Sequence, residues 1–325
     1  MAREKFEDRK LTGHIRVTCK FEDGTERIWE TEKEDVIEHI VHIVNEYNKN
    51  GYLLTLRQLH YQLVTKNWIV NHDSAYKKLG DILDDCKYAG IIDWNSIEDR
   101  GRIPYIPYSI NGIDEALQDT IDQYRLNRQS GQPCHVELWT EKDALSGILR
   151  RSTEKYHIQL VVNKGYTSSS AIYRAYQRFL IALANDQKVV VLYFGDHDPS
   201  GLDMIRDIRD RLLFMFKNGN WSDRLENIDD FEYPMFEVKQ IGLTMSQIKK
   251  YNLPPNPTKL TDSRANGYIQ KFGKTCWEVD ALKPQTLSDI VEKNIEDIID
   301  MEQYNSMLEE EKLNINELKQ IINER

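Results

Sequence analysis

The chain has few cysteines and no long apolar run. Its four cysteines lie far apart and form no CxxC pair, which argues against a zinc ribbon and is typical of a reducing cytoplasm. No stretch approaches the roughly 20 apolar residues that span a bilayer, and the first residues lack the apolar run of a signal peptide. We therefore expect a cytoplasmic protein without a membrane segment.

Negative charge outnumbers positive charge. The 325 residues include 43 Lys and Arg against 53 Asp and Glu, a net charge of −10, which at first argues against a nucleic-acid partner. Residues 286–325 hold eleven acids and four bases, so this part alone accounts for −7 and the rest of the chain is only −3. An acidic tail on a near-neutral body leaves room for a local basic groove.

A continuous apolar run ends in two aspartates. Residues 189–195 do not alternate, which predicts a strand buried on both faces of a parallel sheet. Asp196 and Asp198 follow at its carboxyl end, the edge where open α/β sheets place ligands. Two carboxylates at this spacing point the same way and repel unless protonated or bridged by a cation such as Mg²⁺. The alternative is that Asp196 caps the next helix and Asp198 is a solvated loop residue.

A third carboxylate is expected at the same edge. From residue 134 the pattern alternates between strands and helices, with strands expected at 134–140, 158–165 and 188–195 and helices at 141–156 and 168–184. This order implies a parallel sheet flanked by helices, with right-handed crossovers. Glu141 closes the first strand, so it lands beside Asp196 and Asp198 and completes a predicted Mg²⁺ site. Glu137 is a candidate for an extra ligand.

The N-terminal half follows another pattern. Residues 12–30 alternate around Asp23-Gly24, which predicts a hairpin. Three helical patterns follow, the second capped by Thr55 and the third by Ser74. A strand, a turn and a strand are expected over residues 91–105. Three helices and a two-stranded wing are typical of the winged form of helix-turn-helix, a DNA-docking module.

Basic side chains accompany this pattern. Lys77, Lys78 and Lys87 are expected on the exposed side of the third helix, and Arg100 and Arg102 at the wing. We interpret them as DNA contacts, the alternative being a solvated charged face. A later, less regular stretch offers further cations that either contact phosphates or are solvated: Lys259, Arg264, Lys271 and Lys274.

Two motifs together resemble a known family. Glu141-Lys142-Asp143 at one strand end and Asp196-x-Asp198-Pro199-x-Gly201 at a later one resemble the Toprim domain of topoisomerases, primases and related nucleases. The Pro and Gly resemble most closely the type IIB subset, which comprises the topoisomerase VI A subunit and the meiotic double-strand-break transesterase. In that subset a winged-helix (CAP-like) domain precedes the Toprim domain.

The same subset carries its nucleophilic tyrosine on a winged-helix helix, in the pattern Arg-x-x-aromatic-Tyr. The matching residues here run from Arg57 to Tyr61, with His60 in place of the usual aromatic. The resemblance implies that Tyr61 attacks a DNA phosphate and that Arg57, one helical turn earlier, stabilises the phenolate or grips the phosphate. Lys142 would add positive charge beside the Mg²⁺ ligands.

The resemblance also implies an organisation of the chain into four parts: a hairpin extension at 1–32, a winged-helix domain at 33–133, a Toprim domain at 134–285 and acidic helices at 286–325. It implies a homodimer on double-stranded DNA, in which the tyrosine of one subunit works with the metal site of the other. The chain has no Walker-type GxxxxGK[ST]. We therefore expect either a separate ATPase partner or a short version of the enzyme from a mobile element, associated with the nucleoid.

Two other functions stay open at this point. A Toprim-type nuclease would cut DNA with water, using Glu141, Asp196 and Asp198 without Tyr61. A non-catalytic DNA-binding protein would carry the same carboxylates as structural groups. A primase is disfavoured, because the cysteines for the zinc ribbon often paired with that activity are absent.

Overall fold

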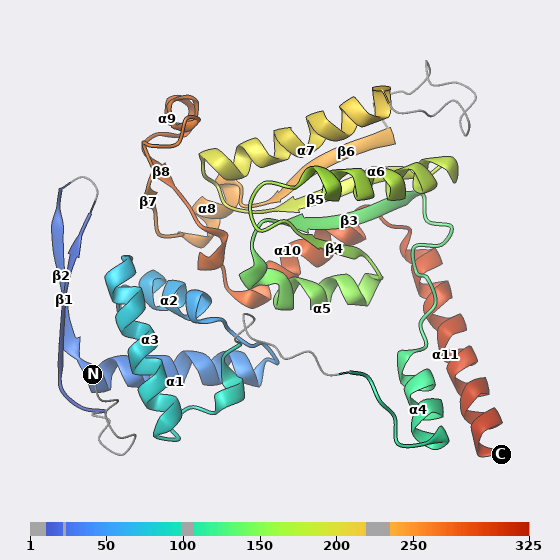
Figure 1. Cartoon of the computed structure of the whole chain (residues 1–325), viewed down its shortest axis with the longest axis horizontal. Helices are drawn as coiled ribbons and strands as arrows, with labels where there is room; N and C mark the ends of the chain where they lie inside the picture. The colour runs from blue at the N-terminus through green and yellow to red at the C-terminus, as the bar shows by residue number, and fades with distance from the viewer. Residues whose placement is uncertain (1–10, 22–23, 99–106, 219–234, 325) are drawn as a thin grey trace.

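The computed structural model (Figure 1) describes residues 11–21, 24–98, 107–218 and 235–324. It begins with the predicted antiparallel hairpin of β1 (His14–Lys20) and β2 (Glu26–Glu32). Gly24 has a φ of 80°, the left-handed conformation that a tight turn requires. Its predicted turn partner Asp23 lies outside the described residues.

The three predicted N-terminal helices are present as α1 (Lys33–Lys49), α2 (Leu56–Thr65) and α3 (Asp73–Tyr88). Thr55 caps α2 as predicted, since its hydroxyl accepts a hydrogen bond from the backbone of the third helical residue and that residue's side chain accepts one from the backbone of Thr55. The predicted cap of α3 by Ser74 is wrong. The helix starts one residue earlier, and the ring of His72 accepts from the Ser74 amide at 3.1 Å.

The first predicted strand of the wing, at the start of residues 91–105, is also wrong. Trp94–Ser96 form a short 3₁₀ helix, η2, because the side chain of Asp93 accepts a hydrogen bond from the backbone two residues on, at 2.8 Å. Asp favours such local turns over strand pairing. Ile97 then makes an isolated parallel bridge with Leu54.

The sheet expected from residue 134 onward is confirmed. Four parallel strands lie in the order β4-β3-β5-β6. Their bounds are Cys134–Thr140 for β3, Gln159–Val162 for β4, Lys188–Phe194 for β5 and Phe236–Gly242 for β6. The chain is thus of the α/β class.

Helices cover both faces of this sheet (Figure 1). On one face, Val189, Val191 and Tyr193 pack with α6 (Ser169–Ala184) and α7 (Pro199–Asn218). On the other, alternate residues of β3 and β5 pack with α5 (Ser146–Tyr156), α10 (Pro284–Glu296) and the N-terminal helices. Burial on both sides explains why β5 is apolar without alternation.

The N-terminal helices share one hydrophobic cluster with the second face of the sheet. Hydrogen bonds join the same parts: the Tyr52 hydroxyl donates to Gln285 at 2.9 Å, and the Gln62 amide donates to the carbonyl of Leu282 at 3.3 Å. Helix α2 therefore packs against η6 (Val279–Ala281), the short 3₁₀ helix that leads into α10.

The remaining elements lie around the sheet. A short 3₁₀ helix, η3 (Asp143–Leu145), precedes α5. Helix α4 (Ile113–Gln123) runs beside the acidic C-terminal helix α11 (Met301–Asn323) (Figure 1). Between β6 and η6 lie four short elements: α8 (Met245–Tyr251), β7 (Asn256–Pro257), α9 (Ala265–Phe272) and β8 (Thr275–Cys276). None of the described helices combines the length and apolar character that crossing a bilayer requires.

Candidate active site

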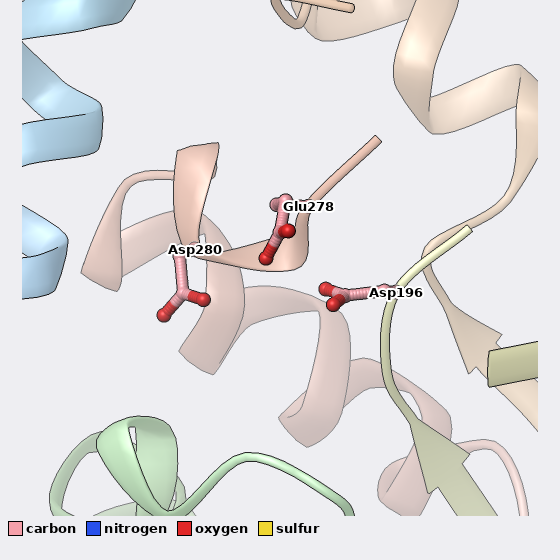
Figure 2. A group of neighbouring side chains, drawn as sticks. All are labelled: Asp196, Glu278 and Asp280. Atoms are coloured by element: carbon pink, nitrogen blue, oxygen red, sulfur yellow. The ribbon is translucent and has the colours of Figure 1, made fainter. Parts of the chain in front are cut away.

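Three carboxylates meet at the carboxyl edge of the sheet. Asp196 follows β5, whereas Glu278 and Asp280 belong to the segment that enters α10 (Figure 2). One oxygen from each lies within 4.8 Å of the other two. Three oxygen donors this close can hold a metal ion.

Backbone pairing brings the two segments together. His197 and Trp277 form an antiparallel bridge, with amide-to-carbonyl distances of 2.9 and 3.1 Å. The amide of Val279 donates to Asp196 Oδ1 at 2.8 Å. The strand end thus fixes where Glu278 and Asp280 lie.

Lys142 lies among the three carboxylates. Its Nζ is 2.7 Å from Asp196 Oδ2 and 2.7 Å from Asp280 Oδ2, and it also contacts Glu278. Burial disfavours the charged ammonium, but the three acids outweigh this effect and raise the pKa of Lys142 well above its ordinary value. The side chain stays charged and acts as the cluster's internal counter-ion.

Arg57 extends the cluster onto α2. Its guanidinium donates to Glu278 Oε2 at 3.1 Å, and its Nε lies 3.5 Å from Asp280 Oδ2. The same guanidinium lies 5.9 Å from the centre of the Tyr61 ring. Burial raises the pKa of Glu278, but Lys142 and Arg57 together bring it down to about 2.

The other two predicted ligands lie at the same edge, outside the tight cluster. Glu141 Oε1 accepts a hydrogen bond from the Asp196 amide at 3.3 Å. Asp198 Oδ1 accepts from the Gly201 amide at 2.6 Å, so Asp198, not Asp196, caps the start of α7. Neither side chain has an ion pair with a cation among the described residues.

Negative charge therefore exceeds positive charge at this edge. Five carboxylates face two cations, Lys142 and Arg57, which leaves a formal charge of −3. Burial raises the pKa of Glu141, Asp196 and Asp198, although Lys142 opposes the effect in each case. A bound divalent cation would relieve this repulsion.

The sequence did not point to Glu278 and Asp280. They share the spacing of two that marks Asp196 and Asp198, but they follow a two-residue strand in an irregular stretch. The candidate ligand Glu137 is directed elsewhere. Its carboxylate is fully buried, accepting from Arg178 of α6 at 2.7 and 2.9 Å and from a tryptophan.

Tyr61 lies beside the carboxylates of its own chain. Its side chain is 7% exposed, and its hydroxyl has no hydrogen-bond partner in the part of the chain that the structure describes. Burial and Glu278 raise its pKa, against the opposing charges of Lys142 and Arg57. The resemblance led us to expect this tyrosine at the metal site of another subunit, whereas the structure brings its helix to the site of the same chain.

His60 takes the place of an aromatic residue in its packing. Its ring meets Tyr61 and Tyr76 edge-on, with centroid distances of 5.5 and 5.4 Å. Burial lowers the pKa of His60 to about 4, so the ring is neutral at physiological pH.

The expected DNA-contacting face of α3 carries both signs of charge. Lys77 is exposed and Lys78 and Lys87 are half-buried. Three exposed aspartates share this helix: Asp73, Asp81 and Asp84. A cavity of about 590 Å³ between α2, α3 and the start of η3 is likewise lined by three cations and four acids. Arg100 and Arg102 lie outside the described residues.

Comparison with protein-family models, with curated proteins and with solved structures finds no match for this chain. Its function has to be inferred from the chemistry of the site.

Proposed function

We propose that this protein cleaves double-stranded DNA by Mg²⁺-dependent tyrosine transesterification, in the manner of the DNA-breaking subunit of a type IIB topoisomerase. The supporting observation is that Arg57 bonds to the acidic cluster while its guanidinium lies beside the Tyr61 ring. One helix thus places a candidate nucleophile beside the acidic cluster, to which the predicted metal ligand Asp196 also belongs. The proposal includes the winged-helix and Toprim assignments for the two halves of the chain.

The donor set fits Mg²⁺, which prefers hard oxygen ligands. Glu278 and Asp280 each have two cationic partners, Lys142 and Arg57, whereas Asp196 pairs with Lys142 alone. Glu141 and Asp198 have no ion pair among the described residues. We therefore assign the ion to the predicted ligands Glu141, Asp196 and Asp198. When bound, Mg²⁺ would polarise the scissile phosphate and stabilise charge in the transition state.

The chain's own residues supply the other parts of the reaction. The Tyr61 oxygen would form a bond to phosphorus while the bond from phosphorus to one ester oxygen breaks, and the tyrosine proton would pass through solvent to the released sugar hydroxyl. Arg57 would exchange its bond to Glu278 for the charged phosphate, to which its fork of donors is well matched. Lys142 would hold the carboxylates in place.

Hydrolysis by water is the second candidate. The Tyr61 side chain is 7% exposed and burial raises its pKa, which makes its hydroxyl a poor nucleophile before substrate binds. A water molecule activated at the same carboxylates would cut DNA without a covalent intermediate.

The organisation proposed with this function is a homodimer in the cytoplasm, associated with the nucleoid. A separate ATPase partner would be needed if strands are passed through the break. A short version of the enzyme from a mobile element would not require an ATPase partner.

A cleavage assay with labelled supercoiled DNA, quenched with detergent with and without proteinase, tests the proposal. In Mg²⁺ we expect cut DNA covalently attached to protein, lost in Tyr61→Phe and in Asp196→Asn and absent in EDTA. Tyr173→Phe, which removes a hydroxyl from an exposed tyrosine of α6, is the matched control. Cleavage that survives Tyr61→Phe but not Asp196→Asn would establish hydrolysis instead, and binding without any cut would overturn both functions.

A further inference from the structure

Residues 244–277 form a basic segment in an acidic chain. They contain a single acid, Asp262, against six cations, which are Lys249, Lys250, Lys259, Arg264, Lys271 and Lys274. The segment therefore carries +5, whereas the whole chain carries −10. Charge separation of this size is typical of surfaces that bind polyanions.

Three of these lysines surround one end of the β7–β8 ladder. The Thr258 amide donates to the carbonyl of Lys274 at 3.0 Å, so Lys259 and Lys274 flank the last pair of the ladder. Lys271 lies in the last turn of α9, shortly before Lys274. All three side chains are exposed, and none forms an ion pair with a described residue.

Arg264 differs from these lysines. Its guanidinium donates to Asp262 at 2.7 Å and also bonds to Tyr166. It lies 3.5 Å from Asp203 of α7. The charge of Arg264 is neutralised by these aspartates, so the positive charge accessible to a ligand comes from Lys259, Lys271 and Lys274.

The basic segment is attached directly to the edge that bears the carboxylates (Figure 1). Besides the bridge between His197 and Trp277, the Tyr268 hydroxyl donates to the His197 carbonyl at 2.9 Å. Ser200, two residues after Asp198, donates to Asp262 at 2.9 Å.

We propose that Lys259, Lys271 and Lys274 bind the phosphate backbone of the nucleic acid beside the acidic cluster, and that they contribute more to its affinity than the lysines of α3. A lysine that neutralises a phosphate displaces a counter-ion from the DNA, and these three lysines have no ion pair with a described residue to break first. The lysines of α3 lie among aspartates, which repel the same phosphates. The inference takes its substrate from the proposed function, but it concerns binding and not cleavage.

Fluorescence anisotropy with a short labelled DNA duplex in EDTA, at a series of KCl concentrations, tests this surface. The variant replaces Lys259, Lys271 and Lys274 with Gln. The matched control replaces Lys77, Lys78 and Lys87 with Gln, so that both variants lose the same net charge. For the first variant we expect about tenfold weaker binding or more at low salt, and a salt slope that is shallower by about 0.9 for each phosphate it no longer neutralises.

Equal losses of affinity in the two variants, or wild-type binding by the first, would overturn the proposal. Binding that needs the three lysines in a protein that never cuts DNA would leave this inference standing and end the proposed function. If the variant without Lys259, Lys271 and Lys274 bound and cut DNA normally, the proposed function would stand and this inference would be overturned. Tighter, lysine-dependent binding to anionic phospholipid vesicles than to DNA would show that the surface serves membranes and would also overturn the proposal.

Discussion

Lys142 sets the charge balance of the site. A lone buried ammonium is costly, but here three carboxylates surround it. Removing it would leave those carboxylates facing one another with only Arg57 nearby. The same repulsion would increase the affinity of the edge for a divalent cation, since lysine and metal ion neutralise overlapping sets of charges.

We predict that Lys142→Met lowers the free energy of unfolding by about 3–5 kcal/mol in EDTA, the usual effect of removing one partner of a buried ion pair. Mg²⁺ should restore part of this loss and stabilise the variant more than the wild type. Urea denaturation with and without Mg²⁺ measures both effects. Lys164→Met is the control, because Lys164 is 69% exposed in its pair with Asp143 and should contribute about 1 kcal/mol at most. Equal stabilisation of variant and wild type by Mg²⁺ would contradict this charge balance.

Among the elements, the start of α7 determines the geometry of the aspartates. A Cβ on Gly201 would lie 2.4 Å from the Asp196 carbonyl oxygen and 3.2 Å from Asp198 Oδ1. The helix can therefore approach the strand end only with glycine at this position. Gly267, in α9, is a contrasting case, since a Cβ there would meet no atom within 4 Å.

We predict that Gly201→Ala destabilises the protein by about 2 kcal/mol or more, because backbone must move to relieve the clash, and that it weakens Mg²⁺ binding. Gly267→Ala should be neutral or stabilise by up to about 1 kcal/mol, as expected inside an exposed helix. Thermal unfolding and calorimetric titration with Mg²⁺ give the two readouts. If both alanine variants behaved alike, the close approach of α7 to Asp196 would not matter for the site.

The elements also show where the sequence was informative. The parallel sheet and Asp196 were predictable, because a buried strand and its carboxyl end leave a local pattern. Glu278 and Asp280 were not, since they reach the site through a single bridge between His197 and Trp277 and not through a regular element. The prediction of the wing's first strand was wrong for a related reason: the local turn at Asp93 competes with strand pairing. The second predicted strand of the wing falls largely on residues 99–106, which lie outside the described residues.

Across the full chain, helix α2 and the acidic cluster meet within a single subunit. The N-terminal helices share a hydrophobic cluster with the sheet, and Arg57 joins α2 to Glu278. A dimer would then present two complete sites, one for each DNA strand. In a site shared between subunits, Tyr61 of each chain would instead have to reach the metal ligands of the other chain.

An experiment with mixed dimers distinguishes a site within one chain from a site shared between subunits. The Tyr61→Phe and Asp196→Asn variants are mixed and left until their dimers have exchanged subunits. With sites inside one chain every subunit is defective, so we predict that the mixture forms no covalent adduct. With shared sites, each mixed dimer would contain one intact pair. Adduct formation by the mixture, but by neither variant alone, would show that the site is built across subunits.

The mass of the tryptic peptide that carries Tyr61 shows whether this residue becomes linked to DNA. Cleavage after Arg57 and Lys66 releases residues 58–66, with Tyr61 as the single tyrosine. After reaction with DNA in Mg²⁺, denaturation and nuclease digestion, we predict a nucleotide phosphate on this peptide. Cut DNA with the peptide unmodified, or with the nucleotide on another peptide, would show that Tyr61 is not the nucleophile.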